Sequence, residues 1–453
     1  MSSGYLLDSD LNVLGISDSV DKNIRNKECL INFICQNNVV ISYKNSRGTD
    51  LCLPSQLIND LGLKVVKVSV SYGYSKVEDN LRLAGYYDNY LKYNEIHDDL
   101  SRYGLNDVDY RNFNHKYKRI DKKLLDERFK NKPLKLSYSN VKLYFACPFS
   151  YFADRILGLN EFKPQMAARL GTFSHAVLED SYDENFNFEE SVRKNMIINS
   201  VDSKDRFFFN RMKDILYPLI KFNKSHESIS SLDIIKREAN IVVVNDGYQF
   251  EGFIDKLMYT IIDDDVYAAI IDYKTGKDVI SLDNIEDGFH LQLPSYMYLL
   301  SKYDEFKNKR LHIIGIYLQK VNLVIFDGKK DYSEQLEKSF YLQGYSVSDI
   351  SLLKLLDPTF SSSSYIKSLS LTSNGFSRYA KIYEKEDQDY MINLVQKLLD
   401  KASCGIKNGD FKIDPKRIDG KNESCLFCKY KDLCFLDESD VIDLPKKVFK
   451  ERD

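Results

Sequence analysis

Two aspartates and a lysine have types and spacing that could form a catalytic centre. Asp272 and Lys274 end the run "AAIIDYK" two residues apart, so their side chains share one face of a strand. Asp255 lies in the preceding β-type run, "FEGFIDKLMYTII". A hairpin that turns at Asp263 and Asp264 pairs residues whose numbers sum to about 527, which sets Asp255 opposite Asp272, with side chains roughly 5 Å apart.

The chemistry that such a set favours is metal-assisted phosphodiester hydrolysis. Two carboxylates this close repel each other, and one lysine offsets the repulsion only in part. Mg²⁺ resolves the conflict, because it binds one or two carboxylates together with waters and substrate phosphate oxygens. The lysine could orient the nucleophile or offset charge on the phosphate. The alternative is a surface hairpin with a chance Asp–Lys pair, but the apolar "AAII" indicates a buried strand, where charge is typical of a site.

Two helix-like segments carry polar pairs that could reach the same place. His175 and Glu179 in "GTFSHAVLED" are i,i+4 neighbours, as are Gln292 and Tyr296 in "HLQLPSYMYLL". A lone histidine on a helix is more often structural, and a Gln–Tyr pair alone is uninformative. Pro294 would disturb the second helix unless it lies in the first turn.

A cluster of cysteines near the C-terminus could hold three corners of a metal site. Cys425, Cys428 and Cys434 form a C-x2-C-x5-C arrangement. The other cysteines outside this cluster are scattered, and a chain expected in the cytoplasm does not need a disulfide framework. Those that we expect to be neutral or core thiols are Cys29, Cys35, Cys52 and Cys404.

Composition bounds the class of protein. The chain has 453 residues, enough for two or three domains, and its net charge of −3 excludes a uniformly basic nucleic-acid binder. No apolar run approaches the roughly 18 residues needed to span a bilayer. The N-terminus lacks the pattern of a secretory signal, so we expect a cytoplasmic protein with no membrane partner. No G-x-x-x-x-G-K-[ST] motif is present to bind ATP phosphates.

Charge is concentrated in one stretch. Between Arg111 and Lys135 there are ten basic and three acidic residues. This stretch is either a solvated linker or an arm that contacts phosphates, and the two interpretations are compatible.

Local patterns predict a mixed α/β chain. In the first 110 residues "NVVISYK" (38–44) indicates a strand and "LPSQLINDLGL" (53–63) a short helix with a capping serine and a terminal glycine. Further helices are expected from about 136 to 158, after Gly171, across 186–228, at 290–303 and at 389–402, with strands at 250–262, 266–274 and 311–320.

Taken in order, these segments resemble a known family. "LSYSNVKLYFACPFSYFADRILGL", "LGTFSHAVLE", "GFIDKL", "IIDYKTGK" and "QLPSYMYLL" are similar to the successive motifs of the PD-(D/E)xK nucleases of the RecB-like branch. "CLFCKYKDLCF" resembles the cysteine motif of the iron–sulfur members of that branch. The resemblance covers roughly residues 134 to 438 and implies an α/β, restriction-endonuclease-like core with a mixed central sheet flanked by helices.

The resemblance also implies roles for single residues. It makes Asp255 and Asp272 metal ligands for Mg²⁺, with Mn²⁺ a compatible substitute because His175 would be a further ligand. The backbone carbonyl of Tyr273 would complete the protein's share, and Lys274 would be the catalytic lysine. The residues expected to contact DNA or support the site are Gln292, Tyr296 and Glu179.

In the iron–sulfur members a single cysteine in an early Cys-Pro completes the cluster, which here is Cys147 in "ACPFSYF". A distribution of one plus three cysteines fits a [4Fe–4S] cluster better than a structural zinc site, which usually has two close pairs. Zinc, or no metal, remains the alternative. The expected role is structural, because the cluster would link the C-terminal segment to the first helix of the nuclease core.

Within that branch the chain resembles the AddB-type component of bacterial helicase–nucleases, through "FYLQGYSVSD" and "VVISYKNSRGTDLCLPSQLI". The expected function is a DNA exonuclease in double-strand-break processing, beside a P-loop helicase subunit on another chain. A non-catalytic DNA-binding scaffold and a stand-alone iron–sulfur nuclease of the kind used in CRISPR spacer acquisition are the alternatives. The expected divisions are a helicase-like remnant (1–110), a basic linker (111–135), the nuclease domain (136–440) and a charged tail (441–453).

Overall fold

The computed structural model divides the chain into two units, Met1–Lys116 and Tyr117–Asp453. It describes residues 8–15, 17–43, 46–47, 50–64, 75–98, 118–129, 132–160, 166–199, 201–276, 280–321, 331–373, 375–434, 436 and 438–449. Among these, no helix is long and apolar enough to cross a membrane.

The described part of the first unit is mainly helical. It contains α1 (Asp8–Val13), α2 (Ser19–Gln36), α3 (Gln56–Asp60), α4 (Lys76–Tyr93) and a two-residue ladder of β1 (Ser46–Arg47) with β2 (Asp50–Leu51).

One local prediction in this unit is confirmed and another is wrong. Ser55 caps α3 by accepting a hydrogen bond from the Leu57 N–H at 3.4 Å, and Gly62 ends the segment with φ of +60°. The strand predicted at 38–44 is not formed over residues 38–43, and residue 44 lies outside the described residues. Val40 is 95% exposed. β-propensity alone therefore does not make a strand where no partner strand covers the apolar side chains.

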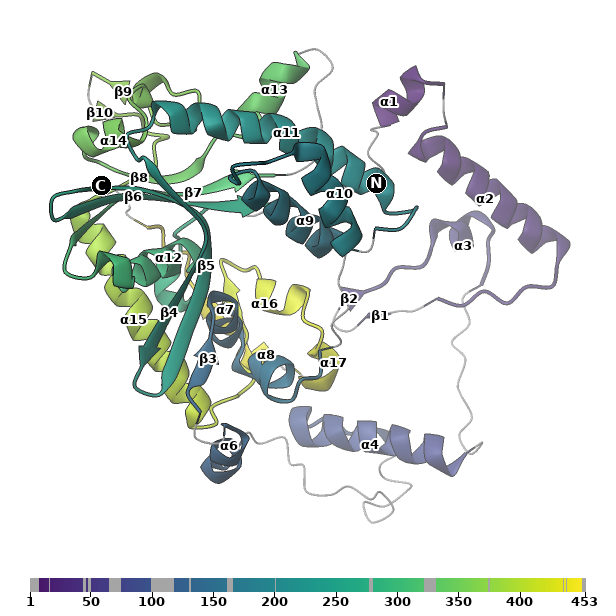
Figure 1. The fold of residues 1–453 in the computed structure, drawn as a ribbon. Coiled ribbons are helices and arrows are strands. Elements are labelled where there is room, and N and C mark those ends of the chain that lie inside the picture. Colours follow the sequence, from purple (N-terminus) through teal and green to yellow (C-terminus); the bar gives the residue numbers. More distant parts are fainter. Residues whose placement is uncertain are drawn as a thin grey trace. The chain divides into compact units, whose positions relative to one another are not determined.

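The second unit is built on a mixed seven-stranded sheet (Figure 1). The strand order is β11-β8-β7-β6-β5-β3, and β4 also pairs with β5. The pairs β4–β5, β5–β6 and β7–β8 are antiparallel, whereas β3–β5, β6–β7 and β8–β11 are parallel. The strands are β3 (Leu134–Leu136), β4 (Ile234–Asn245), β5 (Tyr248–Ile262), β6 (Asp265–Lys274), β7 (Arg310–Lys320), β8 (Gln343–Val347) and β11 (Ile382–Tyr383).

The longest strand, β5, has an interrupted edge. Its residues 248–250 pair with β3 and its residues 256–262 pair with β6, and both partners lie on the edge that β4 does not occupy. On that edge, none of the described strands pairs with residues 251–255 of β5. The sheet therefore opens between the end of β3 and the end of β6, where the polar residues of interest lie.

Helices cover both faces of the sheet (Figure 1). One group contains α7 (Tyr138–Ala146), α12 (Gln292–Ser301) and α15 (Lys385–Lys407), and another contains α9 (Met166–Asp180), α10 (Phe188–Ile198) and α11 (Arg206–Ile229). Gly252 lets α12 approach β5, because a Cβ atom there would lie 2.5 Å from Leu299 Cδ1. The other helices are α6 (Lys122–Phe129), α8 (Pro148–Tyr151), α13 (Tyr332–Ser339), α14 (Ile350–Leu356), α16 (Glu423–Leu426) and α17 (Lys431–Cys434).

Two helices differ from expectation in their bounds. Helix α9 begins at Met166, so Gly171 lies inside it rather than before it. A single glycine weakens a helix by only about 1 kcal/mol, which packing of its buried face outweighs. The helix expected from about 136 to 158 is broken at Cys147, which has extended backbone angles and precedes Pro148 at the first position of α8.

Small strand pairs complete this unit. β12 (Lys416–Ile418) pairs in parallel with β13 (Ile442–Leu444), which lies in the segment predicted as a charged tail, and β9 (Leu371–Thr372) pairs with β10 (Gly375–Phe376). Helix α6 lies in the segment predicted as a basic linker, of which residues 111–117 and 130–131 fall outside the described residues.

Candidate active site

The β5–β6 hairpin has the register expected from its sequence. Its ladder pairs Ile262 with Asp265 and ends with Lys256 opposite Ile271. The next residues along the two strands are Asp255 and Asp272, so these carboxylates lie where the strands separate.

The Tyr273 N–H, just beyond the last paired residues, donates to Asp255 Oδ2 at 2.6 Å. A side-chain carboxylate thus replaces a backbone acceptor at the point where β5 and β6 diverge. This bond holds Asp255 beside β6 without closing the gap in the sheet.

Asp272 is held by three side chains and is only 2% exposed. Gln292 Nε2 and the Tyr296 hydroxyl, both on α12, donate to its Oδ1 at 2.9 and 2.7 Å. Lys274 Nζ lies 2.7 Å from its Oδ2. Pro294 is the third residue of α12 and lies in the first turn, where proline is tolerated.

Burial and the neighbouring Asp255 raise the pKa of Asp272 to about 6, against the opposing influence of Lys274 and Tyr296. A carboxyl whose pKa is raised in the folded state stabilises the protein below its ordinary pKa near 4, and this contribution is lost as pH rises through about 6. At neutral pH the charged Asp272 therefore destabilises the fold.

We expect Tyr296→Phe to increase the free-energy cost of the charged Asp272 carboxylate in the folded state. Loss of the hydroxyl removes a hydrogen bond to the charged form of Asp272, so the pKa of Asp272 rises further. The variant should lose roughly 1–2 kcal/mol of stability at pH 8 relative to wild type, and less at pH 5. Thermal melting at the two pH values measures this difference.

Tyr298→Phe is the matched control, because Tyr298 lies on the same helix and its hydroxyl donates to Gln396 Oε1 at 2.6 Å, away from Asp272. Its loss of stability should be the same at pH 5 and pH 8. Equal pH dependence in the two variants would contradict the assigned role of Tyr296.

His175 completes the acidic end of the site. Its Nδ1 lies 3.4 Å from Asp255 Oδ1 and 3.6 Å from Glu238 Oε1. Burial lowers the pKa of His175, but hydrogen bonds and charge from Asp255 and Glu238 outweigh burial and raise it to about 10. One donor atom from each of His175, Glu238 and Asp255 lies within 4.8 Å of the others, so these three could bind one metal ion.

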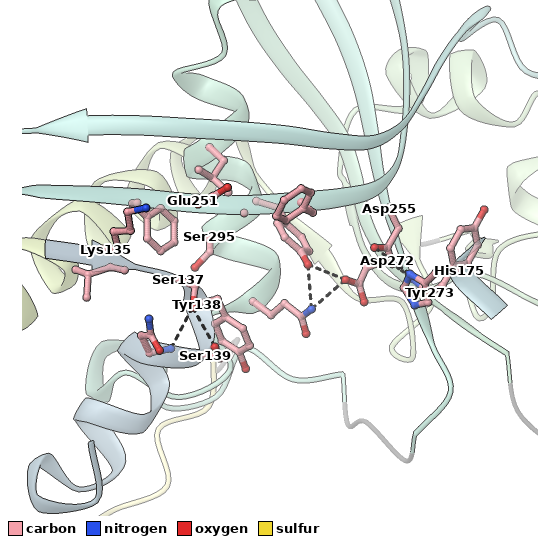
Figure 2. A pocket seen from close by; sticks show the side chains of 18 of the residues that line it. Lys135, Ser137, Tyr138, Ser139, His175, Glu251, Asp255, Asp272, Tyr273 and Ser295 are labelled. Atoms are coloured by element: carbon pink, nitrogen blue, oxygen red, sulfur yellow. Dashed lines mark hydrogen bonds and ion pairs between the residues drawn. The ribbon is translucent and has the colours of Figure 1, made fainter. Parts of the chain in front are cut away.

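His175, Asp255, Asp272 and Lys274 line a cavity of about 500 Å³, and Glu238 is not among the described residues that line it. Figure 2 shows Asp255, Asp272, His175 and Tyr273 together at one end, and Lys135 and the first residues of α7 toward the other. The cavity therefore has an acidic end and a second part that β3 and α7 line with polar side chains. These are Lys135, Ser137, Tyr138, Ser139 and Asn140.

Most of the residues expected at the site meet there, with one exception and one addition. Glu179 is exposed and is not among the described residues that line the cavity, although its backbone carbonyl accepts from Arg237. Glu238, on β4, takes the place beside His175 that helical spacing suggested for Glu179. The β-branched run "IVVV" (241–244), which begins three residues after Glu238, could have indicated β4, but not the position of this carboxylate.

The cysteines lie in a second region. Cys428 Sγ is 3.9 Å from Ser150 Oγ, three residues after the buried Cys147. Burial raises the pKa of Cys425, and the neighbouring Cys428 and Cys434 raise it further. Two further contacts join the C-terminal segment to the residues after α8: Tyr430 donates to Asp154 at 2.6 Å and Lys429 to Asn160 at 2.8 Å.

Cys147 is buried among backbone donors. Burial raises its pKa to about 11, and backbone hydrogen bonding by Ser150, Asp414 and Phe149 opposes the shift. Asp414 Oδ1 is buried and has no hydrogen-bond partner. The surroundings of this thiol would stabilise it as a thiolate only with a further positive charge nearby.

Sequence comparison relates this chain to known proteins. Residues 135–435 match the PD-(D/E)XK nuclease superfamily. The chain is 24% identical over 348 residues to a component of the ATP-dependent helicase/deoxyribonuclease of Carboxydothermus hydrogenoformans, an alignment that covers 67% of this chain and 32% of that protein. It is 24% identical over 446 residues to the equivalent component from Clostridium perfringens strain 13, with 88% and 38% covered.

The chain thus spans about a third of the length of these curated relatives. A crystal structure of a proposed exonuclease from Eubacterium rectale aligns with 65% of this chain and 89% of its own, at 15% identity and a TM-score of 0.31. A score of this size carries no argument.

Proposed function

The chain belongs to the PD-(D/E)XK nuclease superfamily, and from this premise we propose that it is a metal-dependent deoxyribonuclease that hydrolyses phosphodiester bonds. The observation that carries the proposal is the convergence of Asp255, Asp272 and Lys274 where β5 and β6 separate, at one end of a cavity. Buried charge of this kind serves chemistry rather than folding.

The donor set suits a hard divalent cation. Two carboxylates and an imidazole are ligands that Mg²⁺ and Mn²⁺ accept, and Asp255, Asp272 and His175 would hold the ion, with the Tyr273 carbonyl as a further donor. When bound, such an ion polarises a phosphate and lowers the pKa of a water. Gln292 and Tyr296 keep Asp272 oriented through their hydrogen bonds to Oδ1.

Lys274 is the cation that this chain itself supplies. Its Nζ is ion-paired with Asp272 Oδ2 at 2.7 Å, and its side chain is 20% exposed, so it is accessible from the cavity. In the proposed reaction it orients the attacking water or offsets the charge that develops on the phosphate oxygens.

The relatives suggest the biological setting. Proteins named as components of an ATP-dependent helicase/deoxyribonuclease align with this chain over most of its length. We infer that the chain acts on DNA ends as an exonuclease in break processing, beside a helicase subunit on another chain. The N-terminal 110 residues would then be a helicase-like remnant.

We also propose that Cys147, Cys425, Cys428 and Cys434 bind a [4Fe–4S] cluster. Supporting this, Cys428 lies against the segment that carries Cys147, and the neighbouring Cys428 and Cys434 add to the effect of burial in raising the pKa of Cys425. The backbone groups of Ser150 and Asp414, which oppose the rise in the pKa of Cys147, would also stabilise a metal-bound thiolate.

The test is degradation of end-labelled linear DNA by the full chain with Mg²⁺ or with EDTA, using wild type and Lys274→Met. We expect degradation only with Mg²⁺, and a rate at least about a hundredfold lower in the variant, because one electrostatic group at such a site contributes roughly 2.7–4 kcal/mol. Lys320→Met is the control, since Lys320 pairs with Lys274 across β6 and β7 but is not among the described residues lining the cavity.

A purified wild type that binds DNA but does not cut it under any of these conditions would support a non-catalytic scaffold instead. Cutting that is equal in wild type and Lys274→Met would contradict the assigned role of the lysine. Co-purification with a helicase subunit separates a helicase–nuclease component from a stand-alone nuclease.

A further inference from the structure

A further carboxylate, Glu238, lies beside His175 and Asp255, although it is not among the described residues that line the cavity, and it has no counterpart among the residues that the family resemblance names. It lies in the middle of β4, between Arg237, which pairs with Lys256, and Ala239, which pairs with Ile254. By this register Glu238 stands opposite Asp255. Its φ of +42° interrupts the ladder at this one residue.

The contacts of the two aspartates differ. Asp272 Oδ1 accepts hydrogen bonds from Gln292 and Tyr296, whereas the buried Oδ2 is ion-paired with Lys274 Nζ and accepts no hydrogen bond from the described residues. Asp255 Oδ2 accepts the Tyr273 N–H, which leaves its Oδ1 facing His175. At Asp255 Oδ1 an entering cation therefore has to displace only the contact with His175, whereas at Asp272 it meets several protein partners.

Glu238 Oε1 faces the same histidine nitrogen. His175 Nδ1 lies 3.4 Å from Asp255 Oδ1 and 3.6 Å from Glu238 Oε1, and the three donor atoms lie within 4.8 Å of one another. Ligands at about 2.1 Å from a six-coordinate ion lie roughly 3–4 Å apart, which these distances approach. His175 and Glu238 are 29% and 30% exposed, so this group opens to solvent and an ion could enter.

We propose that Glu238 is a metal ligand, and that His175, Glu238 and Asp255 form the site at which a divalent cation first binds. Asp255 belongs both to this site and to the pair of aspartates that it forms with Asp272. This inference rests on the proposed metal-dependent function. It adds a carboxylate that favours a dication over a monovalent ion at the entrance of the site.

The test is to measure Mn²⁺ binding to the full chain. Isothermal titration calorimetry and the electron paramagnetic resonance signal of free Mn²⁺ both report it. Glu238→Gln is the informative variant, because glutamine keeps the size and the hydrogen-bond acceptor for His175 but removes the charge. We expect its Mn²⁺ affinity to fall at least about tenfold. Asp233→Asn, which removes an exposed carboxylate just before β4, should bind Mn²⁺ as wild type does.

Glu238→Gly is a second variant that distinguishes loss of a metal ligand from loss of the fold as the cause of weaker Mn²⁺ binding. Glycine adopts positive φ without strain, so this variant should melt at or above the temperature of wild type and still bind Mn²⁺ at least about tenfold more weakly. If glycine and glutamine both unfold the chain, Glu238 is structural and the proposal fails.

Two outcomes separate this inference from the proposed function. If Glu238→Gln binds Mn²⁺ as tightly as wild type while Asp255→Asn does not bind it, Glu238 is not a ligand and the metal-dependent function stands. If wild type binds no Mn²⁺, the proposed function fails together with the inference.

Discussion

Asp272→Asn is expected to abolish metal-dependent DNA degradation and, in EDTA, to melt at a higher temperature than wild type. The loss should be at least about a thousandfold, because a metal ion at a phosphate contributes several kcal/mol and the variant removes one of its proposed ligands. Asparagine keeps an oxygen to accept from Gln292 and Tyr296, so the loss would not reflect a collapsed site.

The gain in stability follows from the pKa of Asp272, which burial and Asp255 raise to about 6. Two pKa units correspond to about 3 kcal/mol of penalty for the charged form at pH 8. Loss of the ion pair with Lys274 offsets part of this. We therefore expect a net gain of about 1–2 kcal/mol, which should raise the melting temperature by roughly 1–3 °C in a unit of this size.

The gain should disappear at pH 4, where wild-type Asp272 is already protonated. Added Mg²⁺ should raise the melting temperature of wild type more than that of the variant, which keeps His175, Glu238 and Asp255 but lacks the Asp272 carboxylate. Thermal melting at pH 4 and pH 8, with EDTA and with Mg²⁺, measures all of these differences.

Asp265→Asn is the matched control, at the other end of the same strand. Hydrogen bonds from Arg310 and His312 lower the pKa of Asp265 to about 2. Its contribution to stability is present above its ordinary pKa and is lost as pH falls, so this variant should be less stable than wild type at pH 8 and equally active. An Asp272→Asn variant that behaved like Asp265→Asn would indicate an ordinary structural ion pair.

The second large effect is expected from Cys428→Ser. If the four cysteines bind a cluster, the variant should lose most of its iron and much of its stability, because the cluster joins two segments about 280 residues apart. The chain-entropy estimate for closing a loop of that length is about 5 kcal/mol, an upper value here because Tyr430 and Lys429 also hold the segment. DNA binding should weaken before catalysis does.

Iron content, the visible absorption spectrum and thermal melting measure this effect. Cys404→Ser is the control, since Cys404 is exposed on α15 and outside the proposed cluster. Unchanged iron and melting temperature in Cys428→Ser would refute the cluster. Zinc in place of iron in wild type, lost in the variant, would support the structural-zinc alternative.

The sequence was informative about the hairpin because two independent local signals agree there. The turn at Asp263 and Asp264 sets the register, and the charged ends of two apolar runs mark where the strands separate. A family resemblance then added His175, Gln292 and Tyr296, which do lie at the cavity.

The errors arose where long-range packing decides the outcome. Val40 lies in a run of high β-propensity that finds no partner among the described strands, and Gly171 lies within a helix that packing stabilises. Glu238 reaches the site only because β4 pairs with β5 and because one residue adopts positive φ. Neither the pairing nor the φ angle follows from local sequence.

The separation of β5 and β6 also has an evolutionary consequence. The β5–β6 ladder ends at Lys256 and Ile271, so the side chains of Asp255 and Asp272 lie beyond it, and the charge of Asp272 opposes folding at neutral pH. Mutational drift could replace Asp272 by a neutral residue without harming the scaffold, whereas loss of Asp255 would remove the acceptor of the Tyr273 N–H. Inactive descendants of such a protein should accordingly keep the hairpin and its buried surroundings and lose only residues where β5 and β6 separate. A preserved fold alone is therefore a poor guide to retained catalysis.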